Sequence, residues 1–488
     1  MGQPNILLFL TDDHGQWAAG CYGNSELETP HLDRLAQEGV RFANAFTPCP
    51  VCSPARACLL TGRTPSQVGV HDWLQEAVPV IGDFDWLAGE VTLPELLSQA
   101  GYHCGLAGKW HLGRSHTTPR GFDWCFSLPR WQGVHNGPYT YHLNGAARTL
   151  DGNKSTLITD HALQFLEQTP KDRPFFLNVG YIATHSPYQA EAHDPALTAR
   201  FQNATFRDIP PYRPHPWHRN EGLAGGSDPT PEQMRSRYVG YYAAVSEIDR
   251  EVGRILAKLE EQGRLDNTIV VYTSDHGCAL GHHGFWGKGN STRPLNMYET
   301  SLRVPLLIRW PAALPSGQVA TACVDHYDTF QTLCAWAGVD LSRADLAQRA
   351  YPGRSYAGLV TGQAGEEWDD TRYGEYGDLR MIRTRTHKFV KRYPTGPHDL
   401  FHLAEDPGET LNRAGWESDR AIQEELETRL EAWYARHEAS AFSGLAVKFQ
   451  RVHNRNEAWR DGKRERRGLQ VYDPWDVSIS RASGRGNR

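Results

Sequence analysis

The stretch from Tyr241 to Gly277, YYAAVSEIDREVGRILAKLEEQGRLDNTIVVYTSDHG, decides the fold class of this 488-residue chain. Its first part has apolar residues at three-to-four spacing, which predicts one long amphipathic helix that ends at Gly263. The run TIVVYT at 268–273 is almost continuously apolar and predicts a strand buried on both faces. A helix that leads directly into such a strand is the repeating unit of α/β proteins with a parallel sheet.

Units of the same kind occur elsewhere in the first 350 residues. The runs NILLFL (5–10), PFFLNVGYIATHSP (174–187) and RVPLLIRW (303–310) predict further buried strands. Helical patterns, two of which run on into short strands, are found in the segments 30–46, 92–113, 160–168 and 326–338. The alternation predicts an α/β fold over residues 1–350, with a large, mostly parallel sheet sandwiched by helices.

The pattern changes after residue 350. The segment RMIRTRTHKFVKRY (380–393) alternates as a half-exposed antiparallel strand pair does, and AIQEELETRLEAWYARHEA (421–439) predicts a terminal helix. Residues 351–447 are therefore expected to form a smaller C-terminal α+β domain with a short antiparallel sheet. The remaining residues, 448–488, contain 11 Lys and Arg against 5 Asp and Glu. This basic extension is expected either to pack its tryptophans on the body or to serve as an arm for a partner or a homo-oligomer.

Composition and charge exclude several classes of protein. Hydrophobic residues are 39% and charged residues 22% of the chain, which is typical of a globular protein and unlike a fibrous or disordered one. A net charge of −6 does not favour nucleic acid or an anionic membrane as a partner. The longest early apolar run, ILLFL at 6–10, is too short for a membrane span or a signal peptide, so the expected compartment is the cytoplasm. Nine scattered cysteines, an odd number, argue against a disulfide framework.

Acidic residues directly follow two of the predicted strands. Asp12 and Asp13 come after the first strand, and Asp275 and His276 come after TIVVYT. A single Asp at such a position is usually a helix N-cap. Because ligands in doubly wound sheets bind beyond the carboxyl ends of the strands, both pairs are expected at one edge. Three carboxylates and an imidazole there would bind a divalent cation.

Cationic side chains are predicted at the same edge. Lys109 and His111 are two residues apart at the end of a strand, and His185 ends another strand. Lys288 lies between glycines, where the backbone can approach a ligand closely. Together with the carboxylates, such a rim would bind a tetrahedral oxyanion beside a metal ion and activate a nucleophile.

The stretch CPVCSPARACLLTGR (49–63) offers the nucleophile. Its pair of cysteines, Cys49 and Cys52, has the C-x-x-C spacing of a redox dithiol or half a zinc site. The segment from Ser53 onward instead predicts a helix, with Ser53 as N-cap and Gly62 as the stop. Cys52 would then lie at the helix N-terminus, where the free N–H groups favour anions, with Arg56 on the same face.

Here the sequence resembles a known family. Cys52-Ser53-Pro54-Ala55-Arg56 followed by LLTGR is similar to the type I sulfatase signature, C-x-P-x-R with a downstream L-T-G. The motifs TDDHG, GKWHLG, THSP, SDHG, GKG with YETSLRVPLLIRWP, and DLFHLAEDPGETLN also occur in the order typical of this family. On this resemblance the chain is identified as a formylglycine-dependent sulfatase of the alkaline-phosphatase-like superfamily. The basic tail after Lys448 lies outside the resemblance.

The resemblance implies a modified nucleophile and a bound ion. Cys52 would be oxidised by a formylglycine-generating maturation enzyme to Cα-formylglycine, whose aldehyde hydrate attacks sulfur. Asp12, Asp13, Asp275 and His276 would bind one Ca²⁺ together with residue 52, although Mg²⁺ or Mn²⁺ also suits such a donor set. The family more often has Asn at the last of these positions.

The resemblance also implies roles for the cationic rim. Arg56 and Lys109 would hold the hydrate, and His111 would take a proton when the second hydroxyl expels sulfate. His185 and Lys288 would bind sulfate oxygens and help to protonate the leaving alcohol. A thiol that attacked sulfur would form a covalent adduct with no second group to release it. A gem-diol instead uses its second hydroxyl to collapse to the aldehyde and release sulfate.

Three alternatives stay open at this point. Phosphodiesterases and phosphonate monoester hydrolases of the same superfamily share the expected fold, and some also use formylglycine. A zinc site on Cys49 and Cys52 would require a second C-x-x-C or a His pair at ligand spacing, and neither is nearby in the sequence. A redox dithiol would open its helix directly after a strand in a small βαβ unit, and it leaves Pro54 and Arg56 unexplained. A non-catalytic protein on this fold would require that Cys52 is never converted.

Two segments rich in Trp, His, Asp and Asn are interpreted as loops that surround the substrate. They are GVHDWLQEAVPVIGDFDWLAG (69–89) and PRWQGVHNGPYTYHLNG (129–145). Aromatic faces with amide and carboxylate neighbours suit a sugar ring. We therefore expect a small sulfated substrate, a carbohydrate or glycosaminoglycan fragment, in a pocket lined in part by His71, Asp72, Trp73, Trp131 and His135.

Overall fold

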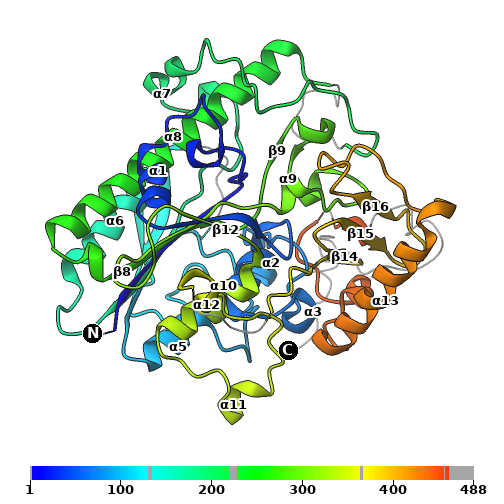
Figure 1. Ribbon diagram of the computed structural model, residues 1–488. Coiled ribbons are helices and arrows are strands. Elements are labelled where there is room, and N and C mark those ends of the chain that lie inside the picture. Colours follow the sequence, from blue (N-terminus) through cyan, green and yellow to red (C-terminus); the bar gives the residue numbers. More distant parts are fainter. Residues whose placement is uncertain (1–2, 130–134, 219–227, 363–366, 456, 461–488) are drawn as a thin grey trace, which may run out of the picture.

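A ten-stranded sheet runs through the centre of the molecule (Figure 1). The computed structural model describes residues 3–129, 135–218, 228–362, 367–455 and 457–460. The strand order across the sheet is β12 (Gln318–Asp325), β2 (Val40–Phe46), β11 (Leu306–Arg309), β8 (Thr268–Ser274), β1 (Asn5–Thr11), β7 (Phe175–Gly180), β3 (His103–Gly108), β4 (Trp124–Ser127), β5 (Asn136–Leu143) and β6 (Ala146–Asn153).

The centre of this sheet is parallel and its flanks are mixed. Strands β8, β1, β7, β3 and β4 are parallel neighbours, as the alternating strand and helix signals predicted. Strand β11 pairs antiparallel with β8 and β2, and β5 and β6 continue the other flank as antiparallel strands. The predicted α/β class is confirmed, and the antiparallel flanks make the whole sheet mixed.

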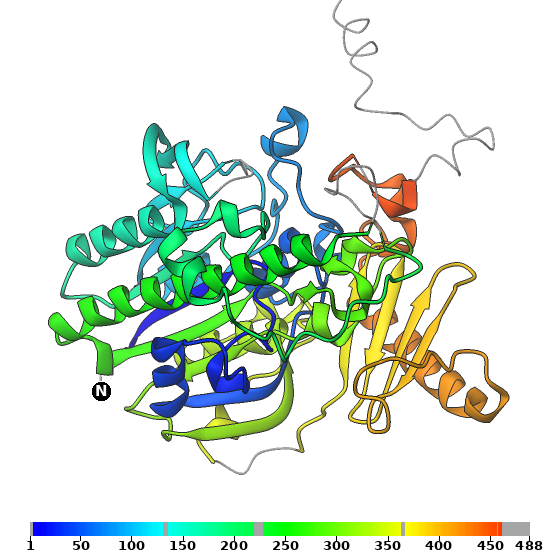
Figure 2. The ribbon, with the colours of Figure 1, turned by 90° about the horizontal axis from the view of Figure 1, so that it is seen from above.

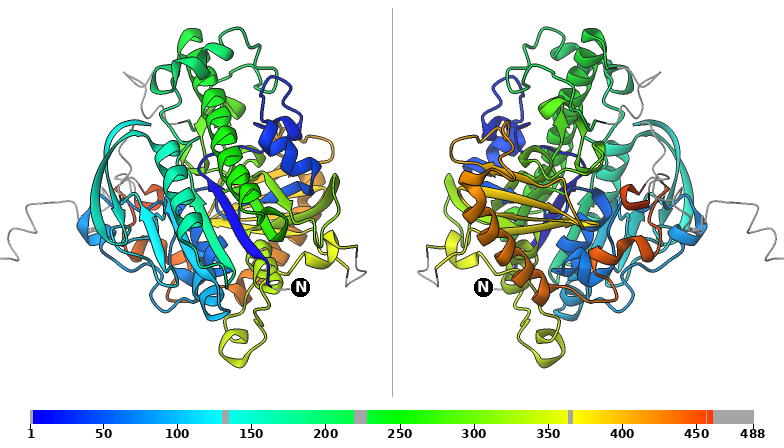
Figure 3. Two further views of the ribbon diagram at one scale, coloured as in Figure 1. Left: turned by 90° about the vertical axis from the view of Figure 1, so that its left-hand side faces the viewer. Right: turned by 90° about the vertical axis from the view of Figure 1, so that its right-hand side faces the viewer.

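Helices cover both faces of the sheet because β1 is apolar on both sides. Leu7 and Phe9 pack with α1 (Pro30–Gln37), α6 (Lys154–Gln168) and α8 (Pro231–Glu261). Ile6, Leu8 and Leu10 point the other way, into a core shared with α2 (Cys52–Thr61), α5 (Leu93–Gln99) and α10 (His326–Trp336). Figures 2 and 3 show α6 and α8 side by side along one face. Among the described residues, no helix has both the length and the apolar character needed to cross a bilayer.

A second, smaller sheet follows in the chain (Figure 2). Its antiparallel strands are β13 (Arg372–Tyr376), β14 (Leu379–Arg383), β15 (His387–Arg392) and β16 (Asp399–His402), and α13 (Arg420–His437) packs against it. The predicted pair is β14 and β15, with Met381 opposite Val390. The expectation that this pair is half-exposed is wrong, because every residue of β14 is buried. Ile382 packs towards α13 and Met381 towards Cys49 and Val51 of the larger unit.

The start of the basic extension packs into the body of the protein. Trp459 is 2% exposed and lies at the edge of the Tyr376 ring. His453 and Asn454 are at most 1% exposed, so this part of the extension is packed into the body, whereas Phe449 is 80% exposed. Trp475, the other tryptophan expected to pack, lies outside the described residues.

The second half of the segment 129–145 is a strand and its turn, not a loop. Residues from Asn136 form β5, which pairs with β6 through a two-residue turn at Asn144 and Gly145. Both turn residues have positive φ, 50° and 82°, as the tight turns of twisted hairpins require. The interpretation of this stretch as a substrate loop is therefore corrected to a hairpin at the edge of the sheet.

Candidate active site

Two pairs of residues meet at the carboxyl edge of the parallel strands. Thr11 of β1 and Ser274 of β8 lie opposite each other in register, so Asp12–Asp13 and Asp275–His276 leave the sheet side by side. All four side chains are at most 1% exposed. The parallel pairing thus brings together residues that are more than 260 positions apart in the sequence.

Cys52 is presented to this edge by the first turn of α2. The helix begins at Cys52 and its N-cap is Val51, so the prediction that Ser53 caps it is wrong. The Ser53 hydroxyl instead accepts a hydrogen bond from the backbone N–H of Leu74, at 3.1 Å. The predicted stop is confirmed, since Gly62 ends the helix with φ 66°.

The sulfur of Cys52 lies among charged groups. Its Sγ is 2.9 Å from Lys288 Nζ, 3.4 Å from Asp12 Oδ1 and 3.4 Å from His276 Nε2. Burial alone would raise the pKa of this thiol, but the ammonium groups of Lys109 and Lys288 hold it well below its usual range. Residue 52 is therefore an anionic centre in its cysteine form.

Each carboxylate of the cluster faces a cation. Arg56 Nε donates to Asp275 Oδ2 at 2.9 Å, Lys288 Nζ to Asp13 Oδ1 at 2.6 Å, and Lys109 Nζ to Asp12. Burial would raise the pKa of Asp13, yet the Lys288 ammonium holds it well below its ordinary value. The charges are thus balanced inside the protein, where an unpaired one would be costly.

The donor atoms fit a hard divalent cation. Asp12, Cys52, Asp275 and His276 offer ligand atoms that all lie within 4.8 Å of one another, as do Asp12, Asp13, Cys52 and His185. Burial and the neighbouring Asp12 carboxylate raise the pKa of Asp275 to about 6, because two buried carboxylates repel each other. A cation between them would relieve that repulsion, and the oxygen-rich set matches hard ions.

A cavity of about 520 Å³ opens over this cluster. The predicted residues His111 and His185 form part of its wall, together with Lys109 and Lys288. His111 Nε2 lies 2.8 Å from the Leu74 carbonyl, and its buried Nδ1 has no hydrogen-bond partner among the described residues. The full lining is Cys52, Trp73, Leu74, Gln75, Glu76, Ala77, Lys109, His111, Leu128, Ile182, His185, Ser186, Lys288, Asn290 and Arg293.

The residues predicted to contact the leaving group are only partly in this wall. Trp73 lines the cavity, but His71 and Asp72 are fully buried behind it and bond to residues 442 and 454. His135 is also buried, with its ring against His193 at 4.6 Å. Trp131 lies outside the described residues. The positions of His71, Asp72 and His135 thus differ from the prediction because neighbouring segments cover them.

Five polar wall residues were not predicted: Gln75, Glu76, Ser186, Asn290 and Arg293. Glu76 belongs to the segment 69–89, three residues after Trp73. Asn290 and Arg293 follow Lys288 within a few residues. Proximity in sequence to predicted site residues was the available signal, although it does not distinguish wall positions from buried ones.

The C-x-x-C pair does not act as a unit. Both groups of described side chains that could hold a metal contain Cys52, and neither contains Cys49. Burial raises the pKa of the Cys49 thiol well above its usual value, which disfavours a reactive thiolate. Within the described part of the chain all nine cysteines are free. The geometry therefore gives no support to a zinc or dithiol module.

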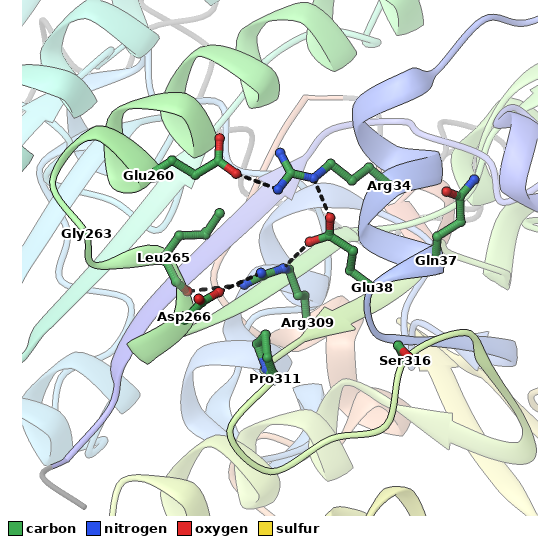
Figure 4. A pocket seen from close by; sticks show the side chains of 10 residues that line it. All are labelled: Arg34, Gln37, Glu38, Glu260, Gly263, Leu265, Asp266, Arg309, Pro311 and Ser316. Atoms are coloured by element: carbon green, nitrogen blue, oxygen red, sulfur yellow. Dashed lines mark hydrogen bonds and ion pairs between the residues drawn. The ribbon is translucent and has the colours of Figure 1, made fainter.

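A second hollow, of about 700 Å³, lies at the opposite edge of the sheet (Figure 4). Its charged side chains pair with one another, since Arg309 Nε is 2.6 Å from Glu38 and Arg309 Nη2 is 2.8 Å from Asp266. Arg34 also pairs with Glu38, at 2.7 Å. With its charged side chains paired and no cysteine or histidine among the described residues of its wall, this hollow gives no support to a second reaction centre.

Comparisons with known proteins agree with this geometry. A family model described as Sulfatase matches residues 4–339, and one described as N-sulphoglucosamine sulphohydrolase, C-terminal, matches residues 281–436. An N-acetylglucosamine-6-O-sulfatase of Bacteroides thetaiotaomicron is 29% identical over 88% of this chain and 86% of its own. An N-acetylgalactosamine-6-sulfatase of Canis lupus familiaris is 30% identical, over 83% and 81%. A solved structure of a protein in complex with its substrate D-glucosamine-2-N,6-O-disulfate has a TM-score of 0.75 and 27% identity, covering 89% of this chain and 98% of that one.

Proposed function

This chain belongs to the sulfatase family, and we propose that it hydrolyses the sulfate ester of a sulfated carbohydrate or glycosaminoglycan fragment. As a sulfatase it is a sulfuric ester hydrolase. The observation that carries the proposal is the meeting of Cys52 with Asp12, Asp13 and Asp275 at the floor of the cavity. Relatives named for 6-sulfated amino sugars support the substrate class.

In this proposal, a metal ion and a formylglycine at position 52, neither of which the unmodified polypeptide contains, complete the site. A Ca²⁺ ion held by Asp12, Asp13, Asp275 and His276 would supply Lewis-acid polarisation of a sulfate oxygen. Residue 52, converted by a maturation enzyme to formylglycine, would supply an aldehyde hydrate as the nucleophile. The short distances between Cys52 Sγ and the carboxylate cluster support both assignments.

The cationic side chains bind and orient the sulfate group. Lys109 and Lys288 line the cavity together with residue 52, and their ammonium groups are available to the negative charge of the transferred group. Arg56 Nη1 donates to the Lys109 carbonyl at 3.1 Å, which fixes the backbone at that lysine. These groups keep their positions before substrate arrives, so little reorganisation is needed during reaction.

The two histidines are suited to proton transfer. His111 turns its unpartnered Nδ1 away from the Leu74 carbonyl, which leaves that nitrogen as a proton acceptor. Burial would lower the pKa of His185, but the nearby Asp13 carboxylate raises it above its ordinary value. His185 therefore tends to hold a proton that it can give to a leaving alcohol.

The remaining wall suits a sugar. Trp73 offers an aromatic face, and Glu76, Asn290 and Arg293 offer polar groups around it. A cavity of about 520 Å³ accommodates one or two sugar rings and is too small for a long polysaccharide segment.

The test is a substrate panel on protein co-expressed with a formylglycine-generating enzyme. The panel contains N-acetylglucosamine 6-sulfate, N-acetylgalactosamine 6-sulfate, glucosamine 2-N,6-O-disulfate, an aryl sulfate, an aryl phosphate diester and an aryl phosphonate monoester. We expect the highest kcat/KM with one of the sulfated sugars. A higher kcat/KM with either phosphorus ester would overturn the assignment in favour of the phosphodiesterase or phosphonate hydrolase alternative.

A further inference from the structure

Residues 453–455, called the strap below, lie against the loop 69–76 that forms part of the cavity wall. Both family matches end before the strap, at residues 339 and 436. The strap is nonetheless buried, with His453 0% and Asn454 1% exposed. Because the strap lies beyond both family matches, the residues that it contacts indicate its role.

The strap bonds to the loop at several successive positions. The His453 carbonyl accepts from the Gln75 N–H at 2.9 Å, and His453 Nε2 lies 3.1 Å from the Gly69 carbonyl. Asn454 Nδ2 donates to Asp72 Oδ2 and, at 3.3 Å, to the Trp73 carbonyl. The loop is thus paired along its length with the strap.

Asp72 is the centre of this junction. Its Oδ1 accepts from the Trp73 N–H at 2.9 Å and from the Tyr376 hydroxyl, while its Oδ2 accepts from Asn454. Asp72 is 2% exposed, and burial raises its pKa to about 6, although the Tyr376 and Asn454 hydrogen bonds and the Arg293 cation act in the opposite direction. A buried carboxylate that depends on hydrogen bonds for its stability loses much when one donor is removed.

The loop in turn connects two parts of the active site. The backbone N–H of Leu74 donates to Ser53 Oγ, next to Cys52, and its carbonyl faces His111 Nε2 at 2.8 Å. Because a carbonyl can only accept a hydrogen bond, the Leu74 carbonyl fixes Nε2 of His111 as a nitrogen that carries hydrogen. His111 has a φ of 63°, so its backbone adopts the left-handed conformation and needs surrounding contacts to hold it.

We propose that the strap positions the catalytic His111 by holding Leu74 in place, so that a segment outside both family matches sets the geometry of the reaction. This rests on the proposed function, since His111 matters only if the site transfers protons. In this scheme Asn454 and Asp72 are positioning residues. They touch no reacting atom and act through the Leu74 carbonyl.

The test compares Asn454→Ala with a matched control, Asn412→Ala. Asn412 has a similar set of bonds, accepting from Leu400 and Ala414 and donating to His398 and Asp399, but it lies beside β16 and away from the cavity. The first measurement is hydrogen exchange of the amides in the loop 69–76, which needs no enzyme activity. The second is kcat and KM of the matured enzyme on a small aryl sulfate and on a sulfated sugar.

We expect Asn454→Ala to speed exchange in the loop and to lower kcat about tenfold or more on both substrates, because misplaced catalytic groups cost that much. The aryl sulfate should show little change in KM, since it does not fill the wall. Asn412→Ala should leave both measurements within about twofold of the wild type. The exchanged pair Asp72→Asn with Asn454→Asp should recover only part of kcat, since it restores the amide–carboxylate bond in reverse but not the bond to the Trp73 carbonyl.

The opposite results would overturn the proposal that the strap positions His111. These are unchanged loop exchange in Asn454→Ala, or an equal loss of kcat in the two alanine variants. Failure of the proposed function would give a different set of results from failure of the strap proposal. A wild type that cleaves the aryl sulfate but no sulfated sugar removes the substrate assignment and leaves the strap test intact. If no ester is cleaved, loop exchange alone decides whether the strap holds the loop.

Discussion

Arg56 Nε donates to Asp275 Oδ2 over 2.9 Å, and the two side chains are 1% and 0% exposed. The pair joins the first helix turns after Cys52 to the carboxyl end of β8. It thereby ties the nucleophile segment to the carboxylate cluster, and it is more deeply buried than the Lys109–Asp12 and Lys288–Asp13 pairs beside it. Removing either partner leaves an uncompensated charge in the interior.

Arg56→Ala is therefore predicted to destabilise the metal-free protein. We expect the free energy of unfolding, measured by urea titration in a chelating buffer, to fall by about 3–5 kcal/mol. Arg56→Lys should lose less, because the charge stays but the bond to the Lys109 carbonyl is lost. A change below about 0.5 kcal/mol in Arg56→Ala would show that water reaches Asp275 and that the pair is not truly buried.

Metal removal should abolish turnover and lower the melting temperature. A ligand that binds only the folded state stabilises it by mass action, so added Ca²⁺ should raise the Tm of chelator-treated protein. Asp13→Asn, which removes one carboxylate from the cluster, should need a higher Ca²⁺ concentration for the same rise. As a control, Asp172→Asn changes an exposed carboxylate and should respond as the wild type does. Full turnover in metal-free protein, checked by elemental analysis, would contradict a metal role.

Glu76 is predicted to set substrate specificity. Its Oε1 accepts from the Gly113 N–H at 2.8 Å and from the Ser115 hydroxyl at 3.0 Å, so the carboxylate is held in the cavity wall. Glu76→Gln preserves one acceptor oxygen and exchanges the other for an amide. We expect KM for the preferred sulfated sugar to rise about tenfold, as loss of a charged hydrogen bond does. The kcat/KM for an aryl sulfate should stay unchanged, and an equal loss on both substrates would contradict a specificity role.

Local patterns were enough to predict the main elements and the chemical cluster. The apolar periodicity of 241–273 predicted α8 and β8, and the rule that ligands bind beyond strand ends brought Asp12 and Asp275 together. The hairpin of β5 and β6 was missed although its Asn144-Gly145 turn is a strong hairpin signal. The Trp and His residues of the segment 129–145 favour a pocket wall on residue type alone.

Other features depend on partners far away in the sequence. His71 and Asp72 were predicted in the pocket wall because their residue types suit a sugar. They are buried because residues 442 and 454, almost 400 positions later, cover them. Likewise β14 is buried on both sides by α13 and the segment around Cys49, which no alternation within β14 itself could reveal. Tertiary cover of this kind overrides local pattern.

Asp249 is predicted to make stability depend on pH away from the active site. Its Oδ1 accepts from the His31 and Leu32 N–H groups at the start of α1, and burial raises its pKa to about 7. The folded state thus holds a proton that the unfolded state has released between about pH 4 and 7. The contribution to stability falls as pH rises through this window, by at most about 1.4 kcal/mol per pH unit.

Asp249→Asn isolates this effect, because the amide oxygen still accepts the two N–H bonds and no longer ionises. Urea unfolding at pH 5 and pH 8 should show the variant gaining stability relative to the wild type at the higher pH. An identical pH dependence in the two proteins would contradict the assignment.

The central claim is that residue 52 acts as formylglycine in a sulfatase site. Mass analysis of the proteolytic peptide that spans Cys49–Arg63, from protein made in its native host, tests it most directly. The account predicts a peptide in which Cys52 has lost its sulfur and two hydrogens and gained one oxygen, with Cys49 and Cys58 unchanged. A peptide that carries unmodified Cys52 throughout, in protein that is active on sulfate esters, would contradict it.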